Sequence, residues 1–330
     1  MSVLVTGGAG FIGSHMVHEL VDAGEDVVVL DSLTTGFRWA VAEQARLVVG
    51  DAGDQALVRA LIRKHDVRSI IHFAGSIVVP ESVADPLGYY HNNTVKSRSL
   101  IEAAVRGGVK TFIFSSTAAV YGDPEVVPVS EDARLQPLSP YGTSKLMTEL
   151  MLADTARAHD LRYVALRYFN VAGADPRGRT GQSTPRATHL IKVACESAVG
   201  KRAGMEVFGT DYATRDGTCI RDYIHVTDLA RAHSAALDYL RRGGDSRVLN
   251  CGYGRGFTVL EVIAAVKKAS GVDFAVKMSP RRPGDSEQVV AKADRIRETL
   301  GWQPRLENLE TIVTQALAWE KRLERIKTAG

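Results

Sequence analysis

The stretch "VLVTGGAGFIGSH", residues 3–15, decides the fold class of this chain. It passes from an apolar, β-branched run into a cluster of glycines and then into a helical pattern. Gly8, Gly10 and Gly13 have the spacing G-x-G-x-x-G, and Gly7, Gly10 and Gly13 stand three apart. Such glycines allow a tight turn, close approach of the backbone to a pyrophosphate, and close packing of helix on strand. The helix N-terminus also offers free N–H groups to phosphates. The stretch therefore predicts a βαβ unit that binds a dinucleotide through Gly7, Gly10 and Gly13.

Strands and helices alternate through the first half of the chain. Apolar runs predict strands at residues 2–6, 26–31, 46–51, 68–75, 110–116 and 162–170. Helical patterns lie at residues 11–23, 54–65 and 86–106, and one further helix carries Tyr141 and Lys145. Continuous Val, Ile and Leu runs indicate strands buried on both faces, and strands separated by helices pair in parallel with right-handed crossovers. The pattern predicts an α/β fold with a doubly wound parallel Rossmann sheet.

The rhythm changes after Gly173, where "ADPRGRTGQSTP" reads as a loop and shorter, mixed elements follow. We therefore expect a dinucleotide-binding Rossmann domain at residues 1–172. A smaller mixed α/β substrate domain is expected at residues 173–330. The segment 221–252 is a candidate to return to the first domain.

The bulk composition argues against several classes of protein. The 330 residues carry 41 basic and 38 acidic side chains, a net charge of +3, too small to indicate a nucleic-acid partner. No apolar run approaches the ~18 residues of a membrane span, and no signal peptide opens the chain. Cys195, Cys219 and Cys251 match no metal or redox spacing. We expect a cytoplasmic protein with no nucleic acid, no membrane contact and no metal.

Two acidic residues follow predicted strands of the dinucleotide-binding unit. Asp31 ends the second strand, where a carboxylate can accept hydrogen bonds from ribose hydroxyls and repels a 2′-phosphate. Asp31 therefore favours NAD over NADP as the cofactor. Asp51 follows the third strand, where it either reaches the adenine edge or serves as a turn or N-cap acid.

A tyrosine and a lysine stand four apart in "SPYGTSK", residues 139–145. At this spacing Tyr141 and Lys145 share one helical face. A phenol with a pKa near ~10 must be acidified by about three units to act as a base, which requires about 4 kcal/mol of anion stabilisation. The Lys145 ammonium and an oxidised nicotinamide could supply it. The pair is a candidate acid–base centre.

Hydroxyl side chains precede this pair in "FSSTAAVYG", residues 114–122, at the end of the fifth predicted strand. The carboxyl ends of parallel strands form the ligand crevice of such sheets. Thr117 is our candidate for polarising a substrate oxygen beside the phenol. Ser115 and Ser116 are expected either to satisfy backbone groups or to contact the cofactor.

Motifs spread over nearly the whole chain carry a resemblance to a known family. They are "VLVTGGAGFIGSH", "IIHFAG", "YYHNN", "FIFSSTAAVYGD", "SPYGTSK", "LRYFNVAGA", "GTCIRDYIHVTDLARAH" and "PRRPGD". With these motifs the chain resembles the extended short-chain dehydrogenase/reductase superfamily, and within it the UDP-glucose 4-epimerases. No single motif carries the resemblance alone.

The resemblance implies roles for residues that match family positions. The implied catalytic set is Thr117, Tyr141 and Lys145. The implied cofactor-binding set adds to the glycines and Asp31 the residues Phe11, Ile12, Ser32, Thr34, Asp51, Ala52, Phe73, Ala74, Gly75, Asn92, Ser115, Tyr141, Lys145 and Phe169. The implied UDP-sugar-binding set is Thr117, Asn170, His189, Leu190, Val207, Phe208, Arg221, Arg282 and Asp285. The resemblance also implies a homodimer, through the helix after Pro86 and the Tyr141 helix.

The implied activity is NAD-dependent inversion of C4 of a UDP-hexose, UDP-glucose or UDP-galactose, through a transient 4-keto sugar with Tyr141 as acid and base. Action on UDP-GlcNAc, UDP-glucuronate or a UDP-pentose stays open, and a small Val289 at a position that is aromatic in some members leaves room for an N-acetyl group. A 4,6-dehydratase is disfavoured, because Ala118 and Ala119 stand where that chemistry needs acids. A non-catalytic dinucleotide sensor is disfavoured by the intact Tyr141–Lys145 pair.

Overall fold

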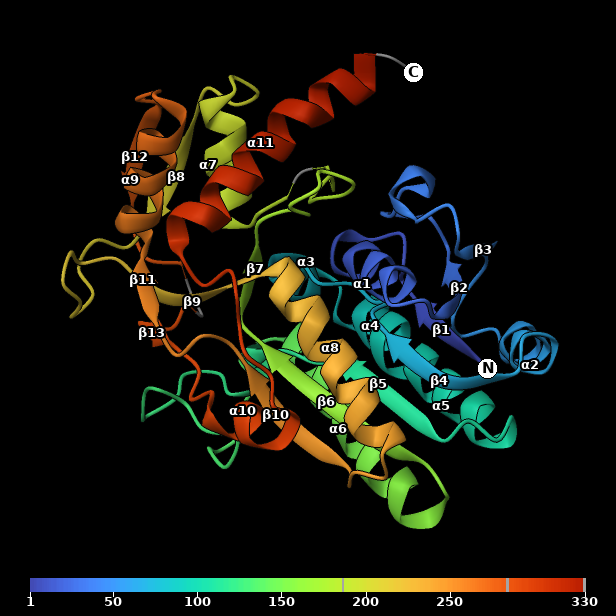
Figure 1. Ribbon diagram of the computed structural model, residues 1–330. Helices are drawn as coiled ribbons and strands as arrows, with labels where there is room; N and C mark the ends of the chain where they lie inside the picture. Colours follow the sequence, from blue (N-terminus) through green and yellow to red (C-terminus); the bar gives the residue numbers. More distant parts are fainter. Residues whose placement is uncertain (186, 283–284, 329–330) are drawn as a thin grey trace.

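A seven-stranded sheet forms the centre of the computed structural model, which describes residues 1–185, 187–282 and 285–328. Its strand order is β10-β6-β5-β4-β1-β2-β3, and every neighbouring pair is parallel (Figure 1). This arrangement confirms the predicted doubly wound α/β sheet. The strands are β1 (Ser2–Thr6), β2 (Asp26–Asp31), β3 (Arg46–Val49), β4 (Val67–His72), β5 (Thr111–Ser115), β6 (Arg162–Tyr168) and β10 (Arg247–Cys251).

Helices cover both faces of this sheet, as alternate residues of β1 show. Val3 and Val5 belong to the hydrophobic cluster that takes in α1 (Phe11–Asp22) and α8 (Val226–Arg241). Leu4 belongs to the cluster that takes in the opposite helices. These are α2 (Gln55–Lys64), α5 (Lys96–Arg106) and α6 (Pro140–Ala158). Period-two alternation of a strand buried on both faces thus builds two separate cores.

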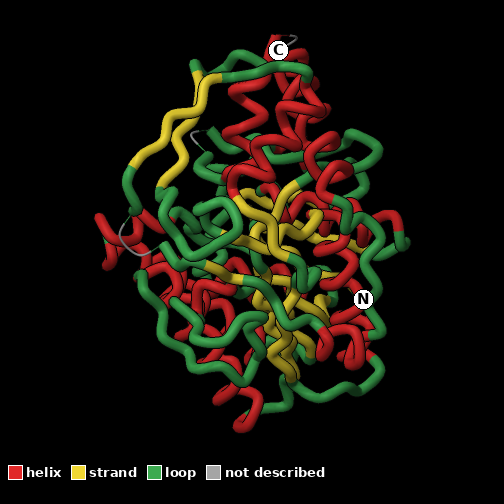
Figure 2. Tube along the Cα trace, turned by 90° about the vertical axis from the view of Figure 1, so that its left-hand side faces the viewer, coloured by secondary structure: helices red, strands yellow, loops and turns green. Residues whose placement is uncertain are grey.

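Much of the later part of the chain forms smaller units that lie beyond the carboxyl end of β6 (Figures 1 and 2). A second sheet joins β7 (Asn170–Ala172), β9 (Ile220–His225), β11 (Gly256–Thr258) and β13 (Gln288–Val289), and a two-stranded sheet pairs β8 (Gly204–Phe208) with β12 (Ala275–Ser279). The helices of this part are α7 (Leu190–Ala198), α9 (Val259–Ser270), α10 (Asp294–Leu300) and α11 (Leu309–Thr328). Short 3₁₀ turns lie at Arg38–Ala40 and Ala118–Val120.

The segment 221–252 lies partly with the large sheet. Helix α8 packs on that sheet, and β10 pairs in parallel with β6 at its edge. Strand β9, at the start of the segment, instead pairs with β7, β11 and β13. The division into domains at Ala172 stays a prediction.

The predicted helix at residues 86–106 is helical throughout but not regular. It comprises α4 (Pro86–Tyr89), a π-helical turn over Tyr90–Val95, and α5, and a further short helix, α3 (Val79–Ala84), precedes it. The predicted strands at 46–51 and 68–75 end earlier, at Val49 and His72. The strand predicted at 162–170 breaks at Phe169, because β6 and β7 belong to different sheets. Among the described helices, none combines the length and apolar character needed to cross a membrane.

Candidate active site

The glycine turn between β1 and α1 has a geometry that side chains would obstruct. Gly7 has a φ of +73°, and a Cβ there would lie 2.6 Å from the Ala74 nitrogen. A Cβ on Gly13 would lie 2.1 Å from the Gly7 carbonyl oxygen. Gly10 is the N-cap of α1, and no side chain caps the helix. The first N–H groups of α1, including those of Phe11 and Ile12, therefore lie where a helix terminus binds phosphate.

The carboxylate of Asp31 is held beside this turn. One of its oxygens accepts from the Ala9 N–H at 2.9 Å, and the other accepts from the Leu33 N–H at 2.8 Å. Each oxygen keeps an acceptor site for a hydroxyl. The exposed Ser32 and Thr34 hydroxyls bond each other next to it, at 2.9 Å. The turn, the helix terminus and the fixed acceptor together fit the pyrophosphate and adenosine ribose of a dinucleotide.

Asp51 and Ala52 lie just beyond the end of β3. Asp51 accepts from the Gly53 N–H at 2.7 Å and pairs with Lys96 at 2.6 Å. Partial burial raises the pKa of Asp51, but the Lys96 ammonium and the Gly53 N–H outweigh this effect and hold that pKa below its usual range. The Asp51 side chain thus serves a turn and an ion pair in this structure, which was one of its two expected roles, while the adenine contact stays a prediction.

The segment after β4 is fastened to the π-helical turn. Asn93 is buried, its Oδ1 accepts from the Ser76 N–H at 2.8 Å, and its Nδ2 donates to the Ser76 carbonyl at 2.9 Å. The neighbouring Asn92 donates to the Ser76 hydroxyl at 2.9 Å. A Cβ on Gly75 would lie 3.8 Å from the Lys145 Nζ. The segment that contains Phe73, Ala74 and Gly75 therefore borders the predicted catalytic lysine.

Lys145 is almost fully buried at the carboxyl end of β5. Its Nζ donates to the Ser115 carbonyl at 3.0 Å and lies 5.0 Å above the Phe114 ring. Burial lowers its pKa to about 8. The Ser115 hydroxyl donates to the Tyr168 phenol at 2.8 Å.

Tyr141 lies one helical turn before Lys145, beside the Thr117 hydroxyl. Burial raises the pKa of Tyr141, and the hydrogen bond with Thr117 opposes that rise. Thr117 also caps the turn that follows it, because its Oγ1 accepts from the Ala119 N–H at 3.1 Å. The structure thus brings the three predicted catalytic residues together. In the chain alone, the pKa shift of Tyr141 is opposite to the acidification a base needs.

The predicted substrate residues beyond Thr117 divide into an inner residue and an outer group. Asn170, next to the predicted cofactor residue Phe169, lies at the break between β6 and β7, next to the end of the large sheet. The outer group consists of His189 and Leu190 at the start of α7, Val207 and Phe208 at the end of β8, and Arg221, Arg282 and Asp285. Their conformations bring several of them close to one another.

The Arg282 guanidinium stacks 4.5 Å above the Phe208 ring and pairs with Asp285 at 2.9 Å. The Arg221 guanidinium donates to the Ser286 carbonyl at 2.7 Å, which places it against the residue that follows Asp285. Burial lowers the pKa of His189, whose Nδ1 lies 3.0 Å from the Gln182 amide. Residues 283 and 284 of the "PRRPGD" motif lie outside the described residues.

A buried polar cluster next to the residues predicted to be catalytic was not predicted from the sequence. Glu149 and Arg167 form an ion pair at 2.6 Å, with 4% of each side chain exposed. The Ser116 hydroxyl donates to Glu149, and Arg167 also donates to the Tyr121 phenol at 3.1 Å. Glu149 lies one turn beyond Lys145 on the same helical face, so the helical spacing offered a signal.

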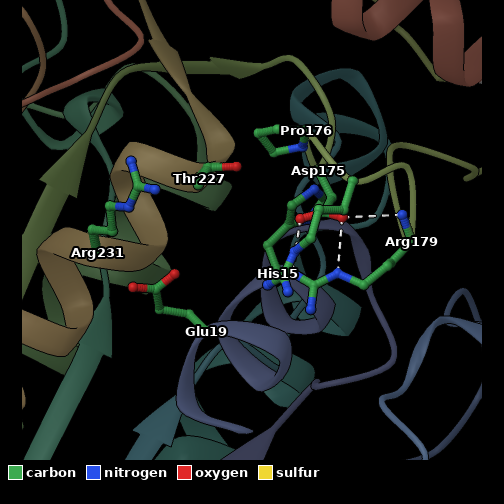
Figure 3. A pocket seen from close by; sticks show the side chains of 8 residues that line it. His15, Glu19, Asp175, Pro176, Arg179, Thr227 and Arg231 are labelled. Atoms are coloured by element: carbon green, nitrogen blue, oxygen red, sulfur yellow. Dashed lines mark hydrogen bonds and ion pairs between the residues drawn. The ribbon is translucent and has the colours of Figure 1, made fainter. Parts of the chain in front are cut away.

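A separate hollow of about 140 Å³ lies between α1, α8 and the loop after β7 (Figure 3). Its wall is formed by His15, Glu19, Asp175, Pro176, Arg177, Arg179, Thr227 and Arg231. No predicted site residue lines it, and Arg179 there pairs with Asp175 at 2.9 Å. Among the described residues, no group of three or more His, Cys, Asp or Glu side chains is placed to hold a metal ion.

A doubly wound sheet with a glycine turn, an acid after its second strand, and a Tyr–Lys pair beside a hydroxyl defines a short-chain dehydrogenase/reductase type of enzyme. Residues 3–252 match the family model described as "NAD dependent epimerase/dehydratase family", and the chain belongs to that family.

Relatives and solved structures agree with this assignment. A UDP-glucose 4-epimerase of Azospirillum brasilense is 58% identical over 315 residues, covering 96% of this chain and 90% of that protein. The UDP-glucose 4-epimerase of Brucella ovis, solved in complex with NAD, superposes with a TM-score of 0.94 at 44% identity, covering 96% of this chain and 97% of that one. The UDP-Glc/GlcNAc 4-epimerase of Campylobacter jejuni gives a TM-score of 0.86 at 48% identity, covering 97% and 99%.

Proposed function

We propose that this chain is an NAD-dependent epimerase that inverts C4 of a UDP-hexose, interconverting UDP-glucose and UDP-galactose. The family to which it belongs is NAD-dependent, and the relative at 58% identity is a UDP-glucose 4-epimerase. The observation that carries the proposal is the convergence of Tyr141, Lys145 and Thr117 at the carboxyl end of β5, beside the glycine turn and the Gly75 segment.

Bound NAD supplies the acceptor and donor of the hydride at the sugar's C4. Tyr141 takes the proton of the 4-hydroxyl and later returns it, while the Thr117 hydroxyl holds the sugar oxygen beside the phenol. Because burial alone raises the pKa of Tyr141, the phenolate needs nearby positive charge. The Lys145 ammonium and the oxidised cofactor provide it, so we propose that Tyr141 ionises only in the loaded enzyme.

Inversion requires that the 4-keto sugar turn over between the two proton transfers. A firm hold on the nucleotide and a loose hold on the hexose allow this. We assign the firm hold to the outer group at α7 and β8 with Arg221, Arg282 and Asp285. A guanidinium suits a diphosphate because it binds two oxygens at once. The ion pair of Arg282 with Asp285 and the carbonyl contacts of Arg221 would have to rearrange or extend when UDP binds.

A broader sugar range is the second candidate. The Campylobacter jejuni protein, 48% identical, is described as acting on both UDP-Glc and UDP-GlcNAc. Val289 lies in β13, paired with Arg221 of β9, and has a small side chain. UDP-GlcNAc is therefore an alternative substrate, and UDP-glucuronate and UDP-pentoses stay open.

We also propose a homodimer that works in the cytoplasm. Large apolar side chains are exposed on neighbouring elements, the segment 77–95 and α6. They are Ile77, Val79, Val83, Leu87, Val95, Met147 and Leu150. An exposed apolar patch of this kind is typical of a protein–protein contact. Cys195, Cys219 and Cys251 are all free and buried, which suits a reducing compartment.

The direct test is to incubate the purified protein separately with UDP-glucose, UDP-GlcNAc and UDP-glucuronate and to look for each C4 epimer. Tyr141→Phe is expected to lower turnover by about 10²–10⁴-fold while NAD stays bound, because the proton acceptor is lost. Tyr163→Phe is the matched control, since both tyrosines are 7% exposed. Tyr163 lies near the amino end of β6, whereas the proposed site lies at the carboxyl ends of the strands. Unchanged turnover in Tyr141→Phe would refute the assignment of the base.

A further inference from the structure

The Glu149 carboxylate is buried behind the catalytic residues and fully engaged. Arg167 of β6 donates to both of its oxygens, with Nε 3.0 Å from Oε1 and Nη2 2.6 Å from Oε2. The Ser116 hydroxyl also donates to Oε1, as the second partner residue. Ser116 is fully buried and Glu149 is 4% exposed. The carboxylate therefore clamps one residue at the end of β5 to α6 and to β6.

The residues on either side of Ser116 are those that the proposed reaction uses. Ser115 offers its carbonyl oxygen to the Lys145 Nζ at 3.0 Å. The Thr117 hydroxyl lies beside Tyr141 and opposes the rise of the Tyr141 pKa that burial causes. Three successive residues of the chain thus meet three side chains spaced four apart on α6. Since the backbone links them, a shift of Ser116 moves the partners of both Lys145 and Tyr141.

We propose that Glu149 is a positioning residue for the epimerase reaction, holding Ser116 so that the Thr117 hydroxyl and the Ser115 carbonyl stay aligned with Tyr141 and Lys145. This rests on the proposed function. Glu149 itself touches neither the substrate nor the cofactor in this assignment. Its role is to set the register between the end of β5 and the catalytic helix.

The clamp is anchored at a distance by further buried hydrogen bonds. Arg167 donates to the Tyr121 phenol at 3.1 Å, and that phenol donates to the Asn250 amide oxygen at 2.6 Å. Asn250 lies in β10, and its Nδ2 donates to the Val129 carbonyl at 2.9 Å. Polar networks whose members are all satisfied are rigid, whereas partly satisfied ones are costly. The edge strand β10, in which Asn250 lies directly opposite Arg167, therefore holds Arg167 in place.

Stability alone does not account for such a cluster. A buried ion pair often contributes no more to folding than well-packed apolar side chains of the same volume. Its geometry, however, is fixed by directional bonds that apolar packing lacks. Alignment of reacting groups matters, since a displacement of ~1 Å can lower a rate by about 10²-fold.

The test uses Ser116→Ala in the full-length holoenzyme, because this change removes only the serine hydroxyl and leaves the Glu149–Arg167 pair intact. We expect kcat to fall by about 10–100-fold with little change in KM. The pKa of Tyr141, followed by phenolate absorbance against Tyr141→Phe, should rise as the Thr117 contact loosens. Ser116→Thr, which keeps a hydroxyl, should restore most of the activity.

The matched control is Ser69→Ala. The Ser69 hydroxyl is also buried and accepts from the Thr111 hydroxyl at 2.6 Å, near the amino ends of β4 and β5 and so at the opposite end of these strands from Ser116. The Ser69→Ala variant should have its unfolding temperature lowered about as much as Ser116→Ala, but its kcat should be unchanged. A second variant, Glu149→Gln, keeps an acceptor for Ser116 but leaves Arg167 without its counter-charge, so it should impair stability and kcat together.

Three outcomes would overturn the positioning role: a kcat for Ser116→Ala within about twofold of the unmodified enzyme, an equal kcat loss in Ser69→Ala, or an unmoved Tyr141 titration. Failure of the proposed function would look different, because the unmodified enzyme would then convert no UDP-sugar. In that case the Tyr141 titration still decides whether Ser116 sets the position of Thr117.

Discussion

At the scale of single residues, Gly7 carries two requirements that can be separated. Its φ of +73° disfavours any side chain, and a Cβ would also strike the Ala74 backbone nitrogen at 2.6 Å. Gly24 has a similar φ of +80° but nothing within 4 Å of its would-be Cβ. Both glycines therefore need a positive φ, but only Gly7 is closely approached by the segment after β4.

We expect Gly7→Ala to lose bound NAD and to unfold at a lower temperature than Gly24→Ala. Gly24→Ala carries only the left-handed strain, about 1–2 kcal/mol, and should keep its NAD. Gly7→Ala adds a backbone clash that pushes the cofactor loop away from the Ala74 segment. Cofactor content after gel filtration and thermal unfolding measure both effects. Equal NAD retention in the two variants would show that the close approach is not needed for binding.

The buried ammonium of Lys145 is predicted to lower the stability of the folded chain while it serves catalysis. Burial lowers its pKa from the ordinary 10.5 to about 8, so between these values the unfolded chain binds more protons than the folded chain. The stability of the unmodified chain should therefore rise with pH across that window, and the penalty for the buried ammonium is present in full below it. At neutral pH the penalty is at most about 3 kcal/mol.

Lys145→Met should accordingly make the cofactor-free protein more stable at neutral pH and remove the alkaline rise in stability. The same change should lower kcat, because the phenolate of Tyr141 loses its cation. Urea unfolding at neutral and alkaline pH, with turnover measured in parallel, tests both parts. A less stable variant at neutral pH would mean that the bond to the Ser115 carbonyl outweighs the cost of burial.

The sequence was enough to predict that Tyr141, Lys145 and the Thr117 hydroxyl converge. Helix periodicity places Tyr141 and Lys145 on one face, and ligand sites of parallel sheets lie at the carboxyl ends of the strands, where Thr117 follows β5. Glu149 and Arg167 could not be paired in the same way. They lie 18 positions apart on different elements, and their contact depends on how α6 packs against β6. The roles assigned to Arg221 and Arg282 also stay predictions, since both now bind partners within the chain.

At the scale of elements, every strand predicted for residues 1–170 exists, but several ends were wrong. The strands predicted to reach residues 51 and 75 end at Val49 and His72. Phe73 and Ala74 continue the apolar run past His72, and Gly50 and Asp51 follow Val49 without a break in the predicted strand, but in both places the backbone turns away from the sheet. The π-helical turn over Tyr90–Val95 was also missed, because π-helix is rare and occurs mostly as a single turn inside an otherwise α-helical segment. Such turns are frequent at functional sites, and here it presents Asn92 and Asn93 to Ser76.

At the scale of the whole molecule, the chain crosses repeatedly between the large sheet and the later part. It leaves the large sheet after β6, returns with α8 and β10, and leaves again to β11. One hydrophobic cluster contains Val3 and Val5 of β1 together with Val262 of α9 and Ile312 of α11. The sequence pattern suggested a return of the segment 221–252, but only the structure shows that β9 pairs in the second sheet.

This interweaving leads us to expect that the full chain unfolds in a single transition, because neither part can open without exposing the shared core. The calorimetric and van't Hoff enthalpies should then agree. A fragment of residues 1–172 should fail to fold, since it lacks the edge strand β10 and the helix α8 that covers Val3 and Val5. Circular dichroism and calorimetry of both proteins provide the measurement. Two resolved transitions in the full chain, or a cooperatively folded fragment, would mean that the boundary at Ala172 separates two independent folding units despite the strand and helix that cross it.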